Sequence, residues 1–375
     1  MSLVTSIDVS TYKNKLDEKT HNLSPLFKDF FNIDCITVTK SEPINYRMRA
    51  EFGVYLEDDN FQYFMVDQNG KTKNRVFIND FPVASVLINK TMPVLKELIC
   101  KNKNLHQRLF AIEFLSSLSN ELLISLIYHK KLDENWQIDG ISLQKEINKQ
   151  IEDAKIKIVG RARKQKIILS EDFIWEKLTV KGKELHYHQQ ENSFTQPNAK
   201  INEQMLSWVI DNTKDNKYDL LELYCGNGNF SIALAPYFDK ILATEISKTS
   251  VQSAQLNIQR NQINNLKIAR LSSEEFTIAA NKEREFNRLK EQNINIDDYN
   301  FKTVLVDPPR AGLDIDTIKL ISQFDNIVYI SCNPNSLADN LKELCKTHEV
   351  KKINFFDQFP YTEHIETGVI LKKKK

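Results

Sequence analysis

The second half of the chain carries the pattern that most restricts its fold. From about residue 197 onward, short apolar runs alternate with segments of helical periodicity, as in a doubly wound sheet of parallel strands. The expected strands are DLLELY, KILATE, KIARL, TVLVD, NIVYIS, KINFFD and GVILK. We therefore predict an α/β fold with a Rossmann-like, seven-stranded domain over residues 191–375. Open α/β sheets bind ligands beyond the carboxyl ends of their strands, so residues at those ends are the first candidates for a site.

Residues 1–190 show a different pattern. The runs YRMRAEFGVYL and FQYFMVD alternate apolar and polar residues around the turn EDDN, which predicts antiparallel strands. Further strands are expected in residues 110–130 and 154–169, around a helix near 139–152. This half is therefore predicted to be a separate α+β domain with a largely antiparallel sheet. The polar stretch TYKNKLDEKTHN near the start is expected to face solvent.

Composition limits the class of protein. The 375 residues are 41% hydrophobic and 27% charged, which excludes a disordered or fibrous chain. No apolar run approaches the roughly 18 residues of a membrane helix, and the first residues lack a signal-peptide core, so we expect a cytoplasmic protein without membrane contact. The five cysteines form no CxxC pair, which argues against a disulfide framework or a zinc site. The net charge of +1 excludes a uniformly basic nucleic-acid binder.

The run LLELYCGNGNFS, residues 220–231, predicts a strand, a tight glycine turn and the start of a helix. The next expected strand ends at Glu245, 19 residues after Gly226, near the spacing of about 20 at which an acidic residue accepts hydrogen bonds from ribose hydroxyls. Ser231 stands where dinucleotide-binding sequences have a third glycine. The combination fits an adenosine ligand without a pyrophosphate, such as S-adenosylmethionine. A turn with a purely structural role is the alternative.

Two later strands end in reactive or charged residues. NIVYIS is followed by Cys332 and an Asn-Pro pair; because the proline breaks the strand, the thiol is expected to face the ligand crevice. TVLV is followed by DPPR, in which two prolines fix Asp307 and Arg310 at the same edge of the sheet. An inert, buried thiol is the common fate of a single cysteine, and we expect it for Cys35, Cys100 and Cys345.

In combination, LELYCGNGNFS, VDPPRAGLD, YISCNP and FDQFPYTEHIETGVIL resemble the tRNA (uracil-5-)-methyltransferase family, as do YRMRAEF and SFTQPN nearer the start. The resemblance spans essentially the whole chain. It implies a class I S-adenosylmethionine-dependent methyltransferase domain behind an RNA-binding domain, and methylation of uridine 54 in the tRNA T-loop to 5-methyluridine. It further implies Cys332 as the nucleophile and Glu366 as the base. The cofactor pocket is implied to contain Gln196, Tyr224, Asn229, Glu245 and Asp307.

The chemistry agrees with these residue types. Uracil C5 is a weak nucleophile until a thiolate adds to C6, so the reaction requires covalent catalysis. After methyl transfer, a base must remove the C5 proton before the thiol leaves. Glu363 is the alternative base. We prefer Glu366 because the family motif places the base directly before a small residue and a glycine, here Thr367 and Gly368.

The RNA substrate has alternatives. Related ribosomal-RNA enzymes often hold an iron–sulfur cluster on four cysteines, whereas Cys35 and Cys100 alone precede residue 200 here. We therefore expect tRNA, bound through its T-arm, with no metal and no iron–sulfur cluster; a monomer is compatible with the sequence. The alternatives are the same reaction on ribosomal RNA or another RNA with a T-loop-like hairpin, and an RNA-folding factor with secondary methylation activity. An amino-group methyltransferase is disfavoured because Arg310 stands where those enzymes have an aromatic residue.

Several basic and aromatic residues are candidates for RNA contacts. Residues 155–166 contain six basic residues and no acid: Lys155, Lys157, Arg161, Arg163, Lys164 and Lys166. We predict phosphate contacts there, with the solvated face of a hairpin as the alternative. The other candidates are Arg47, Arg49, Arg284 and Arg288 for phosphates and Phe52 or Tyr55 for base stacking. The closing KKKK, residues 372–375, is either a contact or a solubilising tail.

Overall fold

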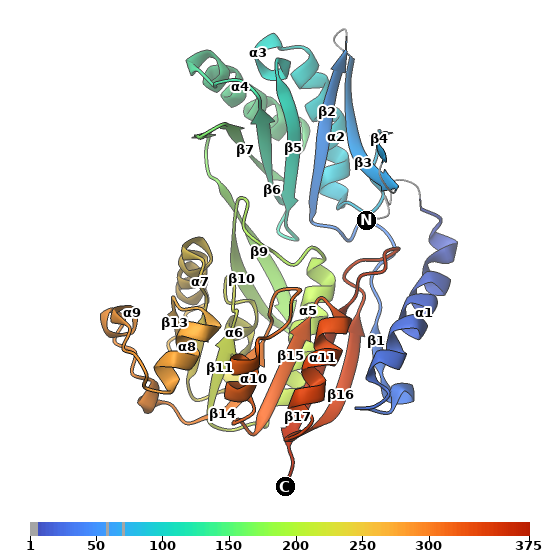
Figure 1. The fold of residues 1–375 in the computed structure, drawn as a ribbon. Helices are drawn as coiled ribbons and strands as arrows, with labels where there is room; N and C mark the ends of the chain where they lie inside the picture. Colours follow the sequence, from blue (N-terminus) through green and yellow to red (C-terminus); the bar gives the residue numbers. More distant parts are fainter. Residues whose placement is uncertain (1–6, 58–59, 70–71) are drawn as a thin grey trace. The chain divides into compact units, whose positions relative to one another are not determined.

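The computed structural model describes residues 7–57, 60–69 and 72–375, and Figure 1 shows the fold. The described chain forms two compact units, each built from several segments. The first contains residues 42–177 and 189–199 with the described residues before Lys13; the second contains residues 13–41, 178–188 and 200–375. The sequence predicted one boundary between residues 190 and 191, whereas in the structure an N-terminal segment packs with the second unit.

The first unit is built around a seven-stranded sheet in the order β4-β3-β2-β5-β6-β7-β8. β6 and β7 pair in parallel, and the other five pairings are antiparallel. The parallel pair follows from its connection, because a helix, α4, lies between the two strands in the chain. The strands are β2 (Arg49–Glu57), β3 (Asn60–Asn69), β4 (Thr72–Ile78), β5 (Leu109–Ser116), β6 (Glu121–Tyr128), β7 (Lys155–Ala162) and β8 (Gln165–Ile168).

Helix α2 (Val86–Cys100) packs on this sheet through an apolar face. Ile88, Met92, Leu95 and Ile99 recur every three or four residues and are buried. The Tyr63 hydroxyl of β3 donates a hydrogen bond to the Met92 carbonyl at 2.9 Å. The other helices of the unit are α3 (Lys103–His106) and α4 (Glu134–Gln150).

The second unit contains an eight-stranded sheet in the order β1-β16-β17-β15-β14-β11-β12-β13. Seven of these strands are the predicted ones, which confirms the Rossmann-like fold. Every residue of β11 and β12 is buried, as central parallel strands require. β17 pairs antiparallel with both of its neighbours. The predicted strands are β11 (Asp219–Leu223), β12 (Ile241–Thr244), β13 (Leu266–Ala269), β14 (Phe301–Val306), β15 (Asn326–Ser331), β16 (His348–Phe356) and β17 (Glu366–Lys373).

Helices alternate with these strands along the chain, which is the connectivity of a doubly wound sheet. After α5 (Ala199–Thr213), each of the first five strands is followed by a helix. Among the described residues, no helix is both long enough and apolar enough to cross a membrane. These helices are α6 (Asn229–Leu234), α7 (Lys248–Arg260), α8 (Ser273–Ala280), α10 (Ile315–Ile321) and α11 (Pro334–Leu344). Two further strands, β9 (Phe173–Val180) and β10 (Lys183–Gln190), form a separate two-stranded sheet.

Most of the N-terminal segment faces solvent, as predicted, but it also makes buried contacts that the sequence did not predict. α1 (Tyr12–Leu23) buries Leu16 and Lys19, and the Lys19 ammonium pairs with Asp357 at 2.5 Å. β1 (Thr37–Thr39) then adds the eighth strand by pairing in parallel with β16. The polar composition of α1 concealed these contacts, because lysine is almost always a surface residue unless it is paired.

The charge-rich segment at residues 281–300, before β14, is partly core. It contains a short helix, α9 (Asn287–Glu291). Phe286, Leu289 and Ile294 are buried in the main apolar cluster of the second unit. The segment is therefore anchored by its apolar residues, although nine of its 20 residues are charged.

Candidate active site

The glycine turn after β11 has the predicted shape. Gly226 and Gly228 have φ angles of 57° and 80°, in the left-handed region that glycine adopts without strain. Gly228 is also the N-cap of α6. A Cβ on Gly226 would meet no described atom within 4 Å, so the backbone of the turn is accessible on that side.

Glu245 fixes this turn through its side chain. Its Oε2 accepts a hydrogen bond from the Gly226 N–H at 3.0 Å, and its Oε1 accepts one from the Ser247 N–H at 2.7 Å. The carboxylate therefore links the ends of the paired strands β11 and β12. The sequence did not predict this second role. A ligand hydroxyl at Glu245 would share a carboxylate that already holds the glycine turn.

The predicted cofactor residues Asn229 and Tyr224 have protein partners. The side-chain amides of Asn229 and Asn202 donate to each other at 2.9 and 2.8 Å, and the Tyr187 hydroxyl donates to the Asn229 carbonyl at 3.0 Å. The Tyr224 hydroxyl lies 2.5 Å from the Ser273 hydroxyl. These contacts fix the start of α6 against α5 and β10, and the end of β11 against α8.

Glu222 on β11 is a candidate that the sequence did not indicate. It is fully buried; one carboxylate oxygen accepts from the Ser231 hydroxyl, and Oε1 has no hydrogen-bond partner among the described residues. Desolvation raises its pKa to about 8, and a buried carboxyl with a perturbed pKa often marks a functional site. The available signal was an acidic residue inside the apolar run LLELY, which a central strand has to bury.

Cys332 and Glu366 come from neighbouring strands. In the antiparallel pairing of β15 with β17, Ser331 lies opposite Thr367 and Ile330 lies opposite Gly368. The next position in the same register places Cys332 beside Glu366 at the carboxyl end of β15. The sequence placed both residues at strand ends, and the register brings them together.

Gly368 allows close packing next to this pair. A Cβ on Gly368 would lie 2.8 Å from the ring of Trp208. Any larger residue would therefore push β17 or α5 away from its present position. Gly368, which follows Glu366 and Thr367, is therefore needed for packing next to the site.

Burial and neighbouring charges shift the pKa values of Cys332 and Glu366 at this strand end. Desolvation, followed by the charges of Glu366 and Asp307, raises the pKa of the half-buried Cys332 thiol to about 11. Glu366 is 5% exposed; burial and Asp307 raise its pKa well above the ordinary value, and burial raises the pKa of Asp307 to about 7. Arg310 opposes these shifts at Cys332 and Glu366. Arg310 therefore favours the charged forms that a nucleophile or a base needs.

Side-chain amides attach the DPPR loop to the elements around Cys332. The Asn333 amide donates to the Arg310 carbonyl at 2.8 Å. On α11, Asn340 accepts from the Leu313 N–H at 2.8 Å and donates to the Leu313 carbonyl at 3.2 Å. The loop is therefore held at Arg310 and again at Leu313, which fixes the backbone of Arg310 relative to the residue that follows Cys332.

Gln196 and Glu363, two other predicted site residues, lie outside the group around Cys332. Gln196 belongs to the 189–199 segment of the first unit, so its place in a cofactor pocket stays a prediction. Glu363, the alternative base, is exposed, whereas Glu366 is buried at the start of β17. Perturbed, desolvated groups are the usual catalytic acids and bases, which favours Glu366.

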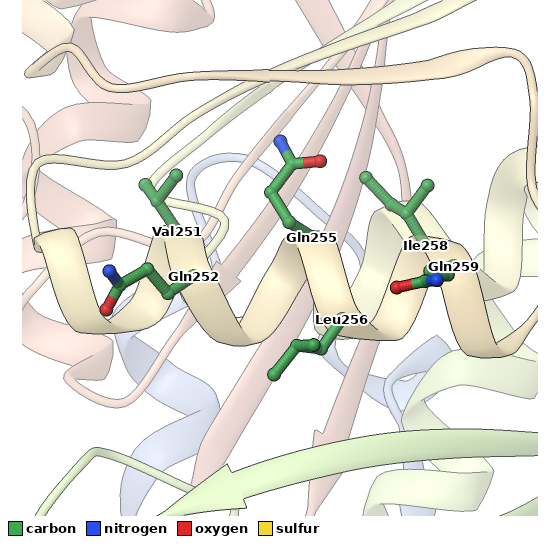
Figure 2. A pocket seen from close by; sticks show the side chains of 6 residues that line it. All are labelled: Val251, Gln252, Gln255, Leu256, Ile258 and Gln259. Atoms are coloured by element: carbon green, nitrogen blue, oxygen red, sulfur yellow. The ribbon is translucent and has the colours of Figure 1, made fainter.

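A surface hollow lies along α7, and Figure 2 shows the side chains that line it. None of its lining residues is titratable, and none is a predicted site residue. We assign it no role in the chemistry. The lining residues are Val251, Gln252, Gln255, Leu256, Ile258 and Gln259.

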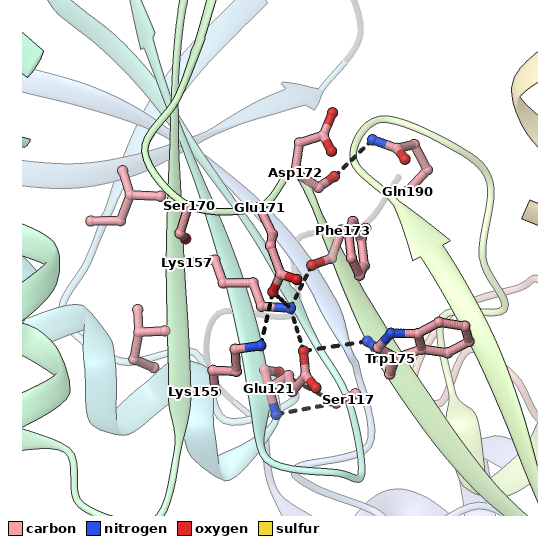
Figure 3. Close-up of polar contacts among 12 residues, drawn as sticks. Ser117, Glu121, Lys155, Lys157, Ser170, Glu171, Asp172, Phe173, Trp175 and Gln190 are labelled. Carbon is pink, nitrogen blue, oxygen red and sulfur yellow. Dashed lines mark hydrogen bonds and ion pairs between the residues drawn. The ribbon is translucent and has the colours of Figure 1, made fainter. Parts of the chain in front are cut away.

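The basic segment 155–166 is largely neutralised. Lys157 is 1% exposed, and its ammonium lies 2.5 Å from Glu121 and 2.9 Å from Glu171 (Figure 3). Lys155 pairs with the same Glu171 at 2.8 Å. Lys157 therefore belongs to a buried network between β6, β7 and the start of β9, so it is structural and not available to phosphates. Lys155 is paired at the edge of this network but is exposed.

Arg161 and Lys166 are also paired with a carboxylate. Arg161 donates two hydrogen bonds to Glu191, at 2.5 and 2.6 Å, and Lys166 lies 2.9 Å from that carboxylate. Although desolvation acts to raise it, hydrogen bonds from these cations lower the pKa of Glu191 to about 2. Four of the six predicted phosphate contacts are thus paired with carboxylates. The exposed residues Arg163 and Lys164 of the β7–β8 turn remain candidates for phosphate contacts.

Phe52 is wrong as a stacking candidate, whereas Tyr55 is accessible. Phe52 is 1% exposed and packs edge-on against other core rings. Tyr55 lies three residues later, on the opposite face of β2. There the Arg75 guanidinium lies 5.2 Å from the Tyr55 ring and 5.0 Å from the Phe64 ring. Phe77 is 49% exposed and lies 5.6 Å from Tyr55, so this face carries accessible aromatic rings.

The remaining basic candidates for phosphate contacts also include both paired and exposed residues. Arg47 and Arg49 donate to backbone carbonyl oxygens of the first unit, and Arg288 pairs with a glutamate of α8 at 2.5 Å. Arg284 is exposed. The final lysines are not a separate tail, because β17 continues into them.

The second unit offers a setting that suits a positively charged ligand. Glu222, Asp307 and Glu366 have raised pKa values, and Asp307 acts on both of the others. A cation relieves such mutual repulsion, and a sulfonium is one. The glycine turn and Asp307 follow the neighbouring strands β11 and β14, so both lie at the carboxyl edge where such sheets bind ligands. The residues therefore fit S-adenosylmethionine.

Comparison with known proteins gives the family. A family model described as tRNA (Uracil-5-)-methyltransferase matches residues 11–374. The tRNA/tmRNA (uracil-C(5))-methyltransferase of Shewanella pealeana is 53% identical over 371 residues, covering 99% of this chain and 100% of that protein. The protein of the same name from Colwellia psychrerythraea is 51% identical over 372 residues, with the same coverage.

A solved structure has the same fold. The crystal structure of Pyrococcus abyssi tRNA (uracil-54, C5)-methyltransferase in complex with S-adenosyl-L-homocysteine matches with a TM-score of 0.71 at 20% identity, covering 99% of this chain and 87% of that one. The fold and the sequence comparisons agree with the resemblance found in the motifs. This chain belongs to the tRNA (uracil-5-)-methyltransferase family.

Proposed function

We propose that this protein transfers a methyl group from S-adenosylmethionine to C5 of uridine 54 in the T-loop of tRNA, giving 5-methyluridine. The observation that carries the proposal is the strand register that sets Cys332 beside Glu366. Methylation of uracil C5 needs both a nucleophile and a base. Relatives about half identical to this chain are named for uracil-C5 methylation of tRNA.

Cys332 is the proposed nucleophile. After the thiol loses its proton, the sulfur adds to C6 of uracil, and the new carbon–sulfur bond leaves an enolate whose C5 can attack a methyl group. The pKa of about 11 means that the thiol form prevails near neutral pH in the absence of further positive charge. Arg310 supplies positive charge from the protein and is the proposed activating residue.

Glu366 is the proposed base. It takes the C5 proton, the electrons re-form the C5–C6 double bond, and the carbon–sulfur bond breaks to release Cys332. Its raised pKa makes the ionised carboxylate a stronger base than an ordinary glutamate. The exposed Glu363 lacks this burial and is the weaker candidate.

Five residues are proposed to line the S-adenosylmethionine pocket: Gln196, Tyr224, Asn229, Glu245 and Asp307. S-adenosylmethionine supplies an electrophilic methyl group on a positively charged sulfur. Glu245 accepts hydrogen bonds from ribose hydroxyls while it keeps Gly226 in place. Asp307 and the buried Glu222 provide negative charge that favours a sulfonium. Asn229 and Tyr224 are held by their neighbours before any ligand binds, which reduces the entropy lost on binding.

The first unit is proposed to hold the T-arm. The target base lies inside a folded loop, so it has to be turned out of its stack to reach a thiol. Arg163 and Lys164 are exposed cations for phosphate contacts, and Tyr55, Arg75 and Phe77 form an accessible aromatic surface for stacking. Since the names of the relatives include tmRNA, another RNA with a T-loop-like hairpin is a second proposed substrate. The proposed location is the cytoplasm.

Mapping of the product tests this function. The pure protein is incubated with methyl-labelled S-adenosylmethionine and, in parallel, unmodified tRNA, the same tRNA with cytidine at position 54, tmRNA and ribosomal RNA. Nuclease digestion then locates the labelled nucleoside. Labelled 5-methyluridine at position 54 supports the proposal. Label that persists in the cytidine variant, or that is greatest in ribosomal RNA, contradicts it.

A further inference from the structure

Lys19 joins the N-terminal helix to the loop that precedes Glu366. Its Nζ donates hydrogen bonds to Asp357 Oδ1 at 2.5 Å, to the Phe359 carbonyl at 3.1 Å and to the His364 carbonyl at 3.0 Å. An ammonium has three N–H donors, so all three are used. Asp357 directly follows β16, and His364 lies two residues before β17. One ammonium therefore connects both ends of the β16–β17 loop.

This contact is buried. Lys19 is 8% exposed and Asp357 is fully buried. Desolvation lowers the pKa of Lys19, and Asp357 opposes that shift. An apolar residue usually packs at least as well as a buried ion pair, so packing of α1 alone does not account for a lysine here. The charge and the three donors are matched to the loop.

The middle of the loop is a folded turn. The Thr362 hydroxyl donates to the Phe359 carbonyl at 2.9 Å, and the His364 N–H donates to the Thr362 hydroxyl at 3.2 Å. Lys19 contacts Phe359 and His364, the two residues that these bonds connect. Displacement of Lys19 would therefore release the turn as a whole, together with the start of β17.

We propose that Lys19 is a positioning residue that holds the β16–β17 loop so that Glu366 reaches the C5 proton. The proposal rests on the assignment of Glu366 as the base. The charges that act on Glu366 are those of Asp307 and Arg310, so Lys19 acts through geometry. Proton transfer needs the two heavy atoms within about 3 Å, and a misplacement of about 1 Å can slow a step by roughly 100-fold. In the proposed order of steps, addition of Cys332 and methyl transfer precede this proton transfer.

Lys19→Met tests this role, with Lys15→Met as the matched control. Lys15 lies on the same helix, is exposed and rests 5.6 Å from the Tyr361 ring. Turnover by Lys19→Met should fall by roughly 10- to 100-fold while KM for S-adenosylmethionine stays unchanged. A denaturation-resistant protein–RNA species carrying the labelled methyl group should accumulate. Lys15→Met should turn over as the parent protein does.

A second variant separates positioning from stability. Lys19→Met leaves Asp357 buried without its counter-charge, which destabilises the fold, whereas Lys19→Met/Asp357→Asn removes both charges. Every variant is assayed at a temperature where circular dichroism shows it folded. Accumulation of the methylated species by the double variant supports positioning. Recovery of parental turnover by the double variant would show that Lys19 only balances a buried charge, and the proposal would be overturned.

Glu366→Gln, assayed in parallel, distinguishes two kinds of failure. If Glu366→Gln does not accumulate the methylated species, the assignment of the base is wrong and the proposal fails with it. If Glu366→Gln accumulates the species and Lys19→Met releases its product at the parental rate, the base assignment stands and the positioning role alone is refuted.

Discussion

Two groups of charged residues in this protein differ in how their charges are compensated. In the first unit, the basic residues of β7 and β8 meet carboxylates in ion pairs of 2.5–2.9 Å. At the carboxyl edge of the sheet in the second unit, Arg310 acts to lower the pKa values of the Cys332 thiol and of Glu366, whereas burial alone shifts the pKa of Asp307. The pKa shifts have opposite signs: the pKa of Glu191 falls to about 2, and that of Asp307 rises to about 7.

This difference separates structural from chemical charge. A buried carboxylate that is matched by cations contributes to stability in its ionised form. In a buried carboxyl without such partners, the ionised form is disfavoured and the pKa is raised. This costs stability, but it suits proton transfer and cation binding. Burial acts on both groups, and the partners decide the outcome. The predictions below test this contrast.

The largest effect is expected from loss of the thiol. Cys332→Ala leaves nothing to add to C6, so label transfer to tRNA should fall to background and no covalent protein–RNA species should form. Cys345→Ala is the matched control, because that thiol is also half-buried but lies at the end of α11, and it should keep full activity. Methylation by Cys332→Ala would refute the covalent mechanism and restore the amino-methyltransferase alternative.

Loss of the base should give a different failure. Glu366→Gln should still form the adduct and methylate it, but the C5 proton then has no acceptor. The methylated adduct should accumulate as a band that survives denaturation and carries the label. Glu363→Gln, in an exposed position on the preceding loop, should release its product normally. The opposite result, with the band in Glu363→Gln, would make Glu363 the base.

Much of the second unit could be predicted because its signals are local. The uniformly apolar strands and the glycine turn define the order of elements, and strand ends define the candidate site. The three-residue strand β1 was missed because TVT is short and half-exposed. Glu222 and Lys19 were also missed, because their roles depend on burial and on partners from other elements.

The basic segment, residues 155–166, shows where prediction from the sequence failed. Its residues are adjacent in sequence, but their partners are not: Lys157 pairs with Glu121 at a separation of 36 residues, and Arg161 pairs with Glu191 at a separation of 30. A charge count over a short window therefore finds a cationic surface where the structure has a neutral network. Charge runs predict function only after their partners are known.

The raised pKa values predict a pH dependence. Cys332 and Glu366 both act after losing a proton, so the single-turnover rate should increase with pH through and above neutrality. Arg310→Leu removes the charge that lowers both pKa values, so the increase should move to higher pH and the rate at neutral pH should fall by roughly tenfold. The rates are measured with saturating tRNA. An unchanged profile in Arg310→Leu would mean that the arginine does not act on these groups.

The stability of two variants compares the charge groups directly. Lys157→Met leaves Glu121 without its cation, whereas Glu171 keeps its pair with Lys155. The free energy of unfolding should fall by about 2 kcal/mol, less than for a fully enclosed pair because both carboxylates are partly exposed. Asp307→Asn removes an uncompensated charge, so stability should stay the same or increase while methylation falls. Urea denaturation gives both values. Equal losses in the two variants would remove the distinction between the groups.

The smallest effect concerns the exposed turn between β7 and β8. Arg163→Gln/Lys164→Asn removes two cations while respecting the φ of 58° at Lys164, which asparagine tolerates. If both residues bind phosphates, the slope of log affinity for tRNA against log salt should decrease by about 0.7–0.9 for each phosphate that is no longer neutralised. Arg161→Gln should weaken the fold through Glu191 and leave the slope unchanged. The reverse outcome would mean that Arg161 exchanges its carboxylate for a phosphate when RNA binds, and that the basic segment acts as the sequence predicted.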